Sequence, residues 1–482
     1  MPCVTSLSYT YPGATRPAFS DISLAVGPGE CLCITGPSGC GKTTLLLAMK
    51  GLLHGGELRG EVALDTPGDR LPTAGAMTAA PARGDGSTGS ERAACAMGDE
   101  VGLVFQNAET QIFCSTVAEE IAFGPENLCV PPDEIGRRVR SALETVGLSG
   151  FWSRNVERLS AGQKHRLAIA SVLSMRPRTL LLDEPTSQLD AAGKAELVSV
   201  LRELKGQGYA LVVVEHNLEP FRPLVDRWAV MEDGRVHAVS HRFPSEYEEP
   251  KADVGAPRGL PSPRDGGPPT IALEDVSLSY PGVGPVLRGV GLRVFRGERI
   301  HVHGQNGAGK SSLLACIAGA VRHDSGTIRV AGVEVTLRAR LFGKVGYLFQ
   351  NPQRQLFETT VHDEVAFSLK RLRLASPDVR QRVSEALEIC EVGPLEGRLP
   401  LSLSFGEPHR VALASVLAPR PAVLLLDEPF SGLDLGQRRR LLSILAALRE
   451  RHATTVVIAS HDPLPVRNWA DRTLELEHGT LA

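Results

Sequence analysis

Two copies of one short pattern constrain this chain more than any other feature of its 482 residues. Residues 36–43 (GPSGCGKT) and 304–311 (GQNGAGKS) both fit GxxxxGK(S/T), and each follows an apolar stretch that predicts a strand. Glycines at these positions let backbone N–H groups surround a phosphate, and the helix that follows adds a favourable dipole. The lysine neutralises phosphate charge, and the last hydroxyl can bind Mg²⁺. The pattern predicts two nucleotide-binding loops.

Other motifs recur at a constant spacing, which indicates an internal duplication. The segment VFQN at 104–107 returns as LFQN 244 residues later, and LLLDEP at 180–185 returns at the same offset. The offset between Lys42 and Lys310 is 268 residues, so an insert of 24 residues lies in the first half. Residues 65–100, rich in Gly, Ala, Pro, Thr and Ser, are predicted to form this insert as a surface loop, and a regulatory insert is the alternative.

The remaining patterning predicts two domains of the same α/β class. A Pro/Gly-rich and charged stretch at 243–269 predicts a linker, with domains at 1–242 and 270–482. Within each half, continuous apolar strands alternate with helices, which predicts a parallel sheet covered on both faces.

Bulk composition narrows the class of protein. The formal net charge is −3, so no nucleic-acid or anionic-lipid surface is expected. No apolar run reaches the ~18 residues that a membrane helix needs, and the N-terminus predicts no secretion signal. The nine cysteines form no CxxC pair and are expected to be small buried hydrophobes rather than metal ligands or disulfides. A role at a membrane would therefore require docking on a membrane partner.

Acidic residues follow a buried strand in each half. Asp183 and Asp427 end apolar strands, where a carboxylate can reach Mg²⁺ beside the phosphate loop. Glu184 and Glu428 come directly after them, where a carboxylate can orient and deprotonate an attacking water. Two solvated acids after a strand would explain one such pair poorly, and two pairs at a shared offset less well.

A small-residue segment predicts a second anion site in the first half. Ser160-Ala161-Gly162-Gln163 opens a predicted helix whose N–H groups are available to an anion. Its own half holds no second phosphate for it. We therefore expect each half to complete the nucleotide site of the other.

The order of phosphate loop, Gln, LSxGQ-like signature, LLLDEP, LD and His resembles the ATP-binding-cassette (ABC) ATPases, and it covers nearly the whole chain twice. The resemblance implies two tandem P-loop NTPase domains. Each would have a mostly parallel sheet core, an antiparallel β subdomain and a helical subdomain. In the family, two cassettes sandwich two ATP molecules head to tail with Mg²⁺.

The resemblance also implies the residue roles. Asp190 and Asp434 would be the acids of the loop after LLLDEP. His216 and His461, which would otherwise be taken as core or surface residues, would contact the γ-phosphate. The implied catalytic residues are Glu184, Glu428, His216, His461, Gln106 and Gln350. The implied Mg²⁺ ligands are Thr43, Gln106, Asp183, Ser311, Gln350 and Asp427. The implied ATP-binding residues, in which the tyrosines stack on adenine, are Tyr11, Gly36, Pro37, Ser38, Gly39, Cys40, Gly41, Lys42, Thr43, Thr44, Ser160, Gly162, Gln163, Tyr280, Gly304, Gln305, Asn306, Gly307, Ala308, Gly309, Lys310, Ser311, Ser312, Ser404 and Gly406.

A narrower resemblance follows the glutamine in each half. The segment at 349–367 fits a pattern FQNPxxQxF…TVxxEVAF, and the segment at 105–124 follows it with Ala108 for the proline and Ile121 for the valine. This pattern is similar to the ATPase subunits of energy-coupling-factor importers, including their cobalt- and nickel-type relatives. It implies docking on a transmembrane T-type scaffold protein and a small membrane substrate-binding component, at the cytoplasmic face of the membrane. The cargo would be a vitamin or a transition-metal ion. The alternative for this segment is an amphipathic helix that packs within its own domain.

Two other functions stay open. One is a soluble tandem ATPase acting on ribosomes or nucleic acid, which the short linker and slightly negative charge disfavour. The other is a nucleotide-binding regulator without turnover, which the presence of Glu184 and Glu428 disfavours.

The second signature, LSFGEP at 403–408, departs from the family pattern. Phe405 stands where the first half has Ala161, and Glu407 adds a carboxylate where the first half has Gln163. Pro408 is tolerable in a first helical turn. We hypothesise that the site with Lys42, Glu184 and Ser404 is slow, and that the site with Lys310, Glu428 and Ser160 carries most turnover.

Overall fold

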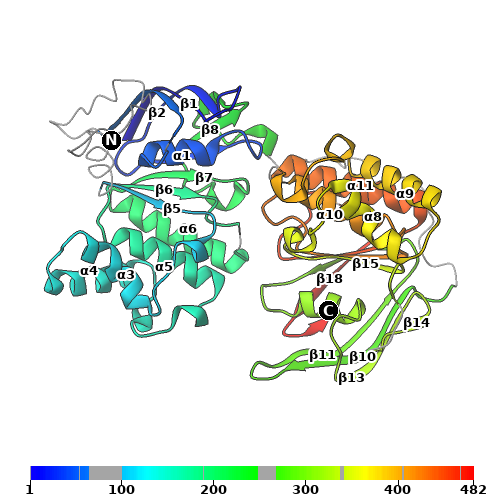
Figure 1. Ribbon diagram of the computed structural model, residues 1–482. Helices are drawn as coiled ribbons and strands as arrows, with labels where there is room; N and C mark the ends of the chain where they lie inside the picture. The colour runs from blue at the N-terminus through cyan, green and yellow to red at the C-terminus, as the bar shows by residue number, and fades with distance from the viewer. Residues whose placement is uncertain are drawn as a thin grey trace. The chain divides into compact units, whose positions relative to one another are not determined.

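A computed structural model describes residues 2–53, 55–64, 100–187, 189–247, 267–336, 341–403, 406–466 and 468–481. The predicted insert at 65–100 lies outside the described residues except for Glu100, and so does most of the predicted linker. The chain divides into two compact units, Met1–Glu248 and Glu249–Ala482. Each is described by itself below (Figure 1).

The first unit contains a large and a small sheet. The large sheet has the order β5-β6-β7-β3-β8-β9, parallel except for the antiparallel edge pair β8-β9, and the small antiparallel sheet has the order β2-β1-β4. Their strands are β1 (Pro2–Thr10), β2 (Phe19–Ala25), β3 (Cys31–Thr35), β4 (Glu57–Leu64), β5 (Val101–Val104), β6 (Thr179–Asp183), β7 (Ala210–Val214), β8 (Arg227–Glu232) and β9 (Arg235–Ser240).

Helices cover both faces of the large sheet. In Figure 1, α1 lies between the two sheets, and α3, α5 and α6 lie on the other side of the large sheet. The alternation of β3 shows why, since Leu32 and Ile34 join the core under α1 while Cys31 and Cys33 join the other core. The helices are α1 (Lys42–Lys50), α3 (Val117–Asn127), α4 (Pro132–Thr145), α5 (Ala161–Leu173) and α6 (Ala191–Gly206), with 3-10 turns at Ala108–Thr110, Ser149–Phe151, Val156–Arg158, Glu219–Phe221 and Ser245–Tyr247.

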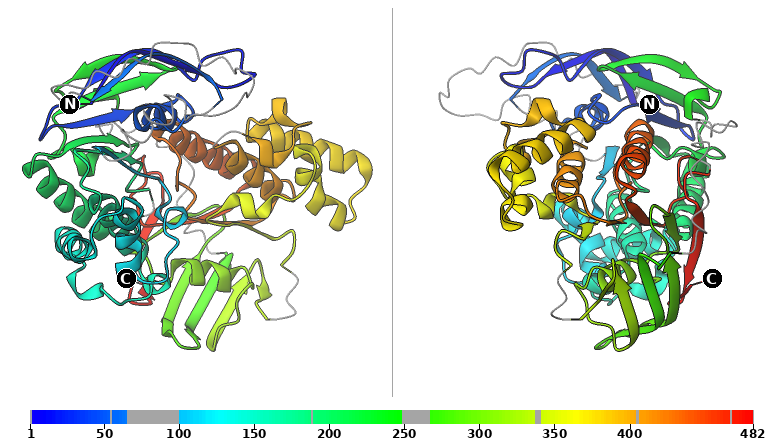
Figure 2. Two further views of the ribbon diagram at one scale, coloured as in Figure 1. Left: turned by 60° about the vertical axis from the view of Figure 1, so that its left-hand side comes forward. Right: turned by 90° about the vertical axis from the view of Figure 1, so that its right-hand side faces the viewer.

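The second unit repeats this plan. Its large sheet has the order β15-β16-β17-β12-β18-β19 and its antiparallel sheet the order β11-β10-β13-β14. Figure 2 shows the layers of each unit from two further sides. The strands are β10 (Ile271–Tyr280), β11 (Gly284–Val294), β12 (Arg299–His303), β13 (Ser325–Val330), β14 (Val333–Glu334), β15 (Val345–Leu348), β16 (Val423–Asp427), β17 (Thr455–Ser460), β18 (Arg472–Glu477) and β19 (Thr480–Leu481). The helices are α7 (Lys310–Ile317), α8 (Val361–Arg371), α9 (Ser376–Ile389), α10 (Glu407–Leu417) and α11 (Leu435–His452), with 3-10 turns at Pro352–Gln355, Gly393–Leu395 and Pro400–Ser402.

The predicted fold class is confirmed in both units. The sequence predicts strands at 30–35 and 298–303 before the phosphate loops and at 179–182 and 422–426 before the acidic residues. They agree with β3, β12, β6 and β16 within one residue at each end. Side-chain caps fix several helix starts, because Thr116, Ser160 and Asp434 each accept the N–H three residues ahead. The cysteines were expected to be buried, but Cys129 is exposed. In the described ranges, no helix has the length and apolar character that crossing a bilayer requires.

Candidate nucleotide site

The two phosphate loops have the same internal geometry. The Lys42 ammonium donates to the carbonyl oxygens of Gly36 at 2.9 Å and Pro37 at 2.8 Å. Lys310 donates to those of Gly304 at 2.8 Å and Gln305 at 3.0 Å. Both lysines are buried. Each loop therefore wraps around its own lysine, which places one positive charge inside a ring of backbone groups.

Glycine is required where each loop enters its helix. Gly41 and Gly309 cap α1 and α7 with φ of 101° and 104°, in the left-handed region. A Cβ atom on Gly41 would lie 2.4 Å from the carbonyl oxygen of Ala18, and one on Gly309 would lie 2.9 Å from that of Val286. Any side chain at either position would push the loop away from this neighbouring backbone.

The predicted metal acids lie beside the loop hydroxyls. Ser311 donates to Oδ1 of Asp427 at 2.9 Å, and Thr43 makes the equivalent hydrogen bond to Asp183. Burial raises the pKa of Asp183 to about 6 and also raises the pKa of Asp427. Within the described residues, Oδ1 of Asp183 is buried without a hydrogen-bond partner. A buried carboxylate with an open oxygen beside a hydroxyl suits a hard divalent cation such as Mg²⁺.

The two predicted catalytic glutamates share an unusual backbone conformation. Glu184 has φ 43° and Glu428 has φ 45°, both in the left-handed region that non-glycine residues seldom adopt. The N–H group of Glu184 donates to the carbonyl oxygen of Val214 at 2.9 Å, and that of Glu428 donates to the carbonyl oxygen of Ala459 at 2.8 Å. These hydrogen bonds tie each glutamate to the neighbouring strand. Such a conformation costs about 1–2 kcal/mol and concentrates at functional sites.

The partners of these glutamates differ between the units. In the first unit, Gln106 donates to Oε2 of Glu184 at 2.7 Å, and Nε2 of His216 lies 2.9 Å from its Oε1. This carboxylate therefore gathers two of the residues predicted from sequence.

In the second unit, His461 reaches Glu428 through Nδ1 at 2.8 Å, and Lys310 lies 3.3 Å from the other carboxylate oxygen. Burial alone would raise the pKa of Glu428, but the hydrogen bond and charge of His461, with the charge of Lys310, together lower it below its ordinary value. Gln350 is exposed, and the described residues give its side chain no hydrogen bond. Unlike Gln106, it does not reach its glutamate.

The signature segments also differ. In the first unit, Ser160 and Gln163 form a capping box at the start of α5, so the helix begins at Ala161. In the second unit, α10 begins only at Glu407, after Gly406 with φ 88° and no side-chain cap. Ser404 and Phe405 lie outside the described residues. The later helix start leaves the second signature without the capped N-terminus that the first one has.

The two tyrosines predicted to stack on adenine lie beside the helices that follow the phosphate loops. The hydroxyl of Tyr11 lies 3.1 Å from that of Thr44, and the hydroxyl of Tyr280 lies 3.4 Å from that of Ser312. Tyr11 is 44% exposed, so its ring can receive a planar ligand. The aspartates of the loop after LLLDEP, Asp190 and Asp434, cap α6 and α11.

Comparison with known proteins decides the family. The family model described as ABC transporter matches residues 19–187 and 287–431. The chain belongs to the ABC transporter family. It is 33% identical to an ABC transporter ATP-binding protein of Methanosarcina acetivorans, over 98% of this chain and 84% of the relative. It is 32% identical to one of Caldanaerobacter subterraneus subsp. tengcongensis, over 97% and 88%. A solved complex of an archaeal ribosomal stalk protein with the recycling factor aABCE1 matches with TM-score 0.63 at 20% identity, over 99% and 89%, and so shares the fold.

As a tandem ABC ATPase, the chain carries two domains of a kind that binds and hydrolyses ATP with Mg²⁺. Two further residues beside the candidate site of this ABC protein were not predicted from its sequence. Tyr347 donates to Asp427 at 3.3 Å, and Glu215 is buried, accepting the N–H groups of Thr186 and His216. The signal for Glu215 was available, since it is an acid at the end of the all-apolar strand β7.

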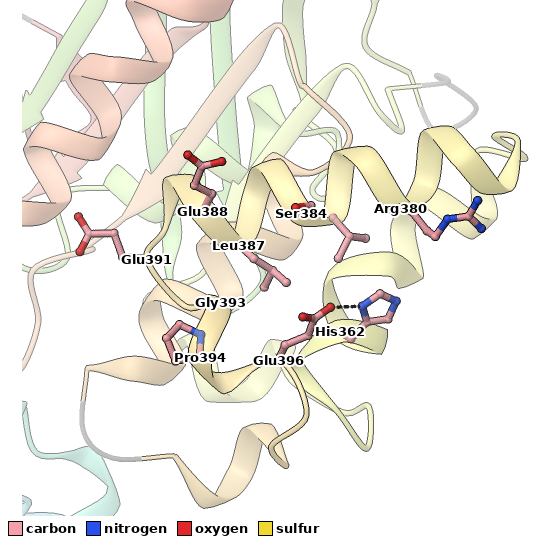
Figure 3. A pocket seen from close by; sticks show the side chains of 10 residues that line it. His362, Arg380, Ser384, Leu387, Glu388, Glu391, Gly393, Pro394 and Glu396 are labelled. Carbon is pink, nitrogen blue, oxygen red and sulfur yellow. Dashed lines mark hydrogen bonds and ion pairs between the residues drawn. The ribbon is translucent and has the colours of Figure 1, made fainter.

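A hollow of about 550 Å³ lies on the helical part of the second unit, lined by none of the predicted nucleotide-binding residues. In Figure 3, Glu396 and His362 face one another beside it, with Nδ1 of His362 2.7 Å from Oε1 of Glu396. In the first unit, Trp152 stands at the position of Glu396. The backbone N–H of Ala118 donates to the carbonyl oxygen of Trp152, just as the backbone N–H of His362 donates to that of Glu396. This surface of the ABC ATPase therefore differs between its units.

Proposed function

We propose that this ABC ATPase energises import through a membrane-embedded scaffold protein, in the manner of the energy-coupling-factor type. A vitamin or a transition-metal ion would be the cargo of a small membrane component. ATP binding and hydrolysis would drive the cycle, with Glu184 and Glu428 accepting a proton from the attacking water. Asp183 with Thr43, and Asp427 with Ser311, would hold Mg²⁺.

One observation carries the transport role: each unit displays an aromatic pair with at least one exposed ring on the segment after its glutamine. The rings of Phe113 and Phe123 meet edge to face at 4.6 Å, and those of Phe357 and Phe367 at 4.8 Å. Phe113 is 64% exposed and Phe357 60% exposed. Exposed aromatic rings at matching places are typical of a surface that binds a partner.

A buried carboxylate holds each pair in place. Glu120 accepts the N–H groups of Phe113 at 3.1 Å and Cys114 at 2.9 Å, and Glu364 accepts those of Phe357 at 2.8 Å and its neighbour at 2.9 Å. Packing within the domain is served by other residues of the same helices, such as Val361. The phenylalanines are therefore available to a partner, and we assign them to the cytoplasmic segments of the scaffold.

Site-specific photo-crosslinking tests this proposal. Benzoylphenylalanine placed at 113 or 357 in native membranes should form a covalent adduct with a multispanning membrane protein. The same probe at Val283, which is 77% exposed in the turn between β10 and β11, is the matched control and should not. A ribosomal protein captured at 113 and 357, or equal capture of the membrane protein from 283, would contradict the proposal.

A further inference from the structure

Two histidines on β12 anchor the loop that carries His461. Nε2 of His303 lies 3.0 Å from the carbonyl oxygen of His461, and Nε2 of His301 lies 2.8 Å from the hydroxyl of Ser460. The two histidines lie on one side of the strand with ring centroids 5.7 Å apart. In the first unit, Cys33 and Thr35 occupy the corresponding positions before the phosphate loop.

The direction of these hydrogen bonds follows from the acceptors. A carbonyl oxygen can only accept, so Nε2 of His303 carries a proton and donates to His461. The hydroxyl of Ser460 donates to the carbonyl oxygen of Asp462 at 2.7 Å, which uses its only hydrogen. His301 must therefore donate from Nε2 to Ser460. Both carbonyl groups of residues 461 and 462 are thus tied to the strand that runs into the phosphate loop.

The first unit holds its equivalent loop by another route. Glu215 accepts the N–H groups of His216 at 2.9 Å and Asn217 at 3.3 Å, together with that of Thr186 at 3.0 Å. Over the described part of the chain, the hydroxyl of Thr35 has no hydrogen-bond partner. The side chain of Glu215 therefore ties the loop after β7 to the segment after Glu184. The link of this loop to the phosphate-loop strand is a backbone one, from the N–H of Glu215 to the carbonyl oxygen of Ile34 at 3.1 Å.

The anchor matters because His461 has two carboxylates within reach. Its Nδ1 is 2.8 Å from Glu428, while its Nε2 is 3.7 Å from Oδ1 of Asp462. Arg438 pairs with the other oxygen of Asp462 at 3.3 Å and also donates to the carbonyl of Leu433. Without the carbonyl anchor, a small shift of the loop would let His461 leave Glu428 for Asp462.

We propose that His303, supported by His301, is a positioning residue for ATP hydrolysis in the second unit, because it holds His461 on Glu428. The proposal rests on the ATPase activity of the family and on the larger share of turnover expected at the Glu428 site, and not on the transport role. Its failure would therefore leave the proposed function untouched, and a crosslinking failure would leave this proposal untouched.

Substitutions at position 303 test the anchor. His303→Leu keeps the bulk and removes the donor, whereas His303→Gln can place an amide N–H near Nε2. Small misplacements of catalytic groups can lower the rate by up to ~100-fold. We therefore expect His303→Leu to lower kcat by about tenfold and to leave the KM for ATP within about twofold of the native value. Gln should restore kcat to within about threefold of the native rate. Thr35→Val, the matched change in the first unit, should leave kcat and the melting temperature unchanged.

A double-mutant cycle separates positioning from folding. In a His461→Ala background, the His303→Leu change should lower kcat by less than about 1.5-fold, because the group that it positions is absent. Any of three results would overturn the proposal. They are a loss of kcat by the same factor in both backgrounds, a kcat of His303→Leu within about twofold of the native value, and a His303→Gln variant as slow as His303→Leu.

Discussion

His461 presents Nδ1 to Oε2 of Glu428 at 2.8 Å. Its counterpart His216 presents the opposite ring nitrogen, Nε2, to Oε1 of Glu184 at 2.9 Å. The same motif therefore gives the two predicted catalytic glutamates different surroundings, because the groups behind each histidine differ. Glu215 stands before His216, whereas Ser460 stands before His461. Identical motif order does not make the two sites equivalent.

Alanine substitution of the signature glycines should affect stability in opposite ways. Gly406 has φ 88°, and a Cβ atom there would lie 2.6 Å from Nε2 of Gln437, so Gly406→Ala should lower the free energy of unfolding by about 1–3 kcal/mol. Gly162 lies in α5 with its nearest neighbour atom 3.7 Å from such a Cβ, so Gly162→Ala should change it by less than about 1 kcal/mol, in the stabilising direction. Denaturant unfolding without nucleotide measures both, and an equal loss in the two variants would contradict the geometry.

Removal of the buried carboxylate under the second aromatic pair should destabilise the helical part of that unit. Glu364→Leu leaves two backbone N–H groups without an acceptor, at a cost of about 2–4 kcal/mol. Lys370→Ala on the same helix removes only an exposed ion pair with Asp363, so its cost should stay below about 1 kcal/mol. Thermal unfolding compares the two variants. A Glu364→Leu protein as stable as the Lys370→Ala control would show that the carboxylate does not hold the segment.

Acid should destabilise the second unit through a partly buried histidine. Burial lowers the pKa of His409 in α10 to about 4, from an ordinary value of 6.5, and its Nε2 has no hydrogen-bond partner among the described residues. The unfolded chain then binds a proton more readily than the folded one, so stability is full above pH 6.5 and falls as the pH drops toward 4. Between pH 7 and pH 5 the loss should be on the order of 2 kcal/mol.

The measurement is the urea midpoint at pH 7 and pH 5 for the native chain and His409→Leu. The variant lacks the titrating group and should lose less stability on acidification. The same pH-dependent shift in both proteins would assign the acid sensitivity to other groups.

Sequence patterns predicted the features that depend on local order along the chain. The phosphate loops, the strand ends at Asp183 and Asp427, and the capped helix after Ser160 all follow from short motifs whose geometry is fixed by backbone hydrogen bonds. Sequence patterns could not predict which ring nitrogen of His461 faces Glu428, because contacts between strands far apart in the sequence set the orientation of that ring. The exposure of Gln350 was missed for the same reason, since the segment after β15 sets it through tertiary packing.

Steady-state ATPase rates of Glu184→Gln and Glu428→Gln test the central claim, which is that the two sites are unequal. If the crossed pairing that the family resemblance implies holds, Glu428 would work with the capped signature at Ser160, and Glu184 with the signature whose helix starts late. Because removal of a general base costs about 10²–10⁴-fold at the site concerned, Glu428→Gln should abolish most turnover, while Glu184→Gln should retain at least about half. Equal losses in the two variants would contradict the account.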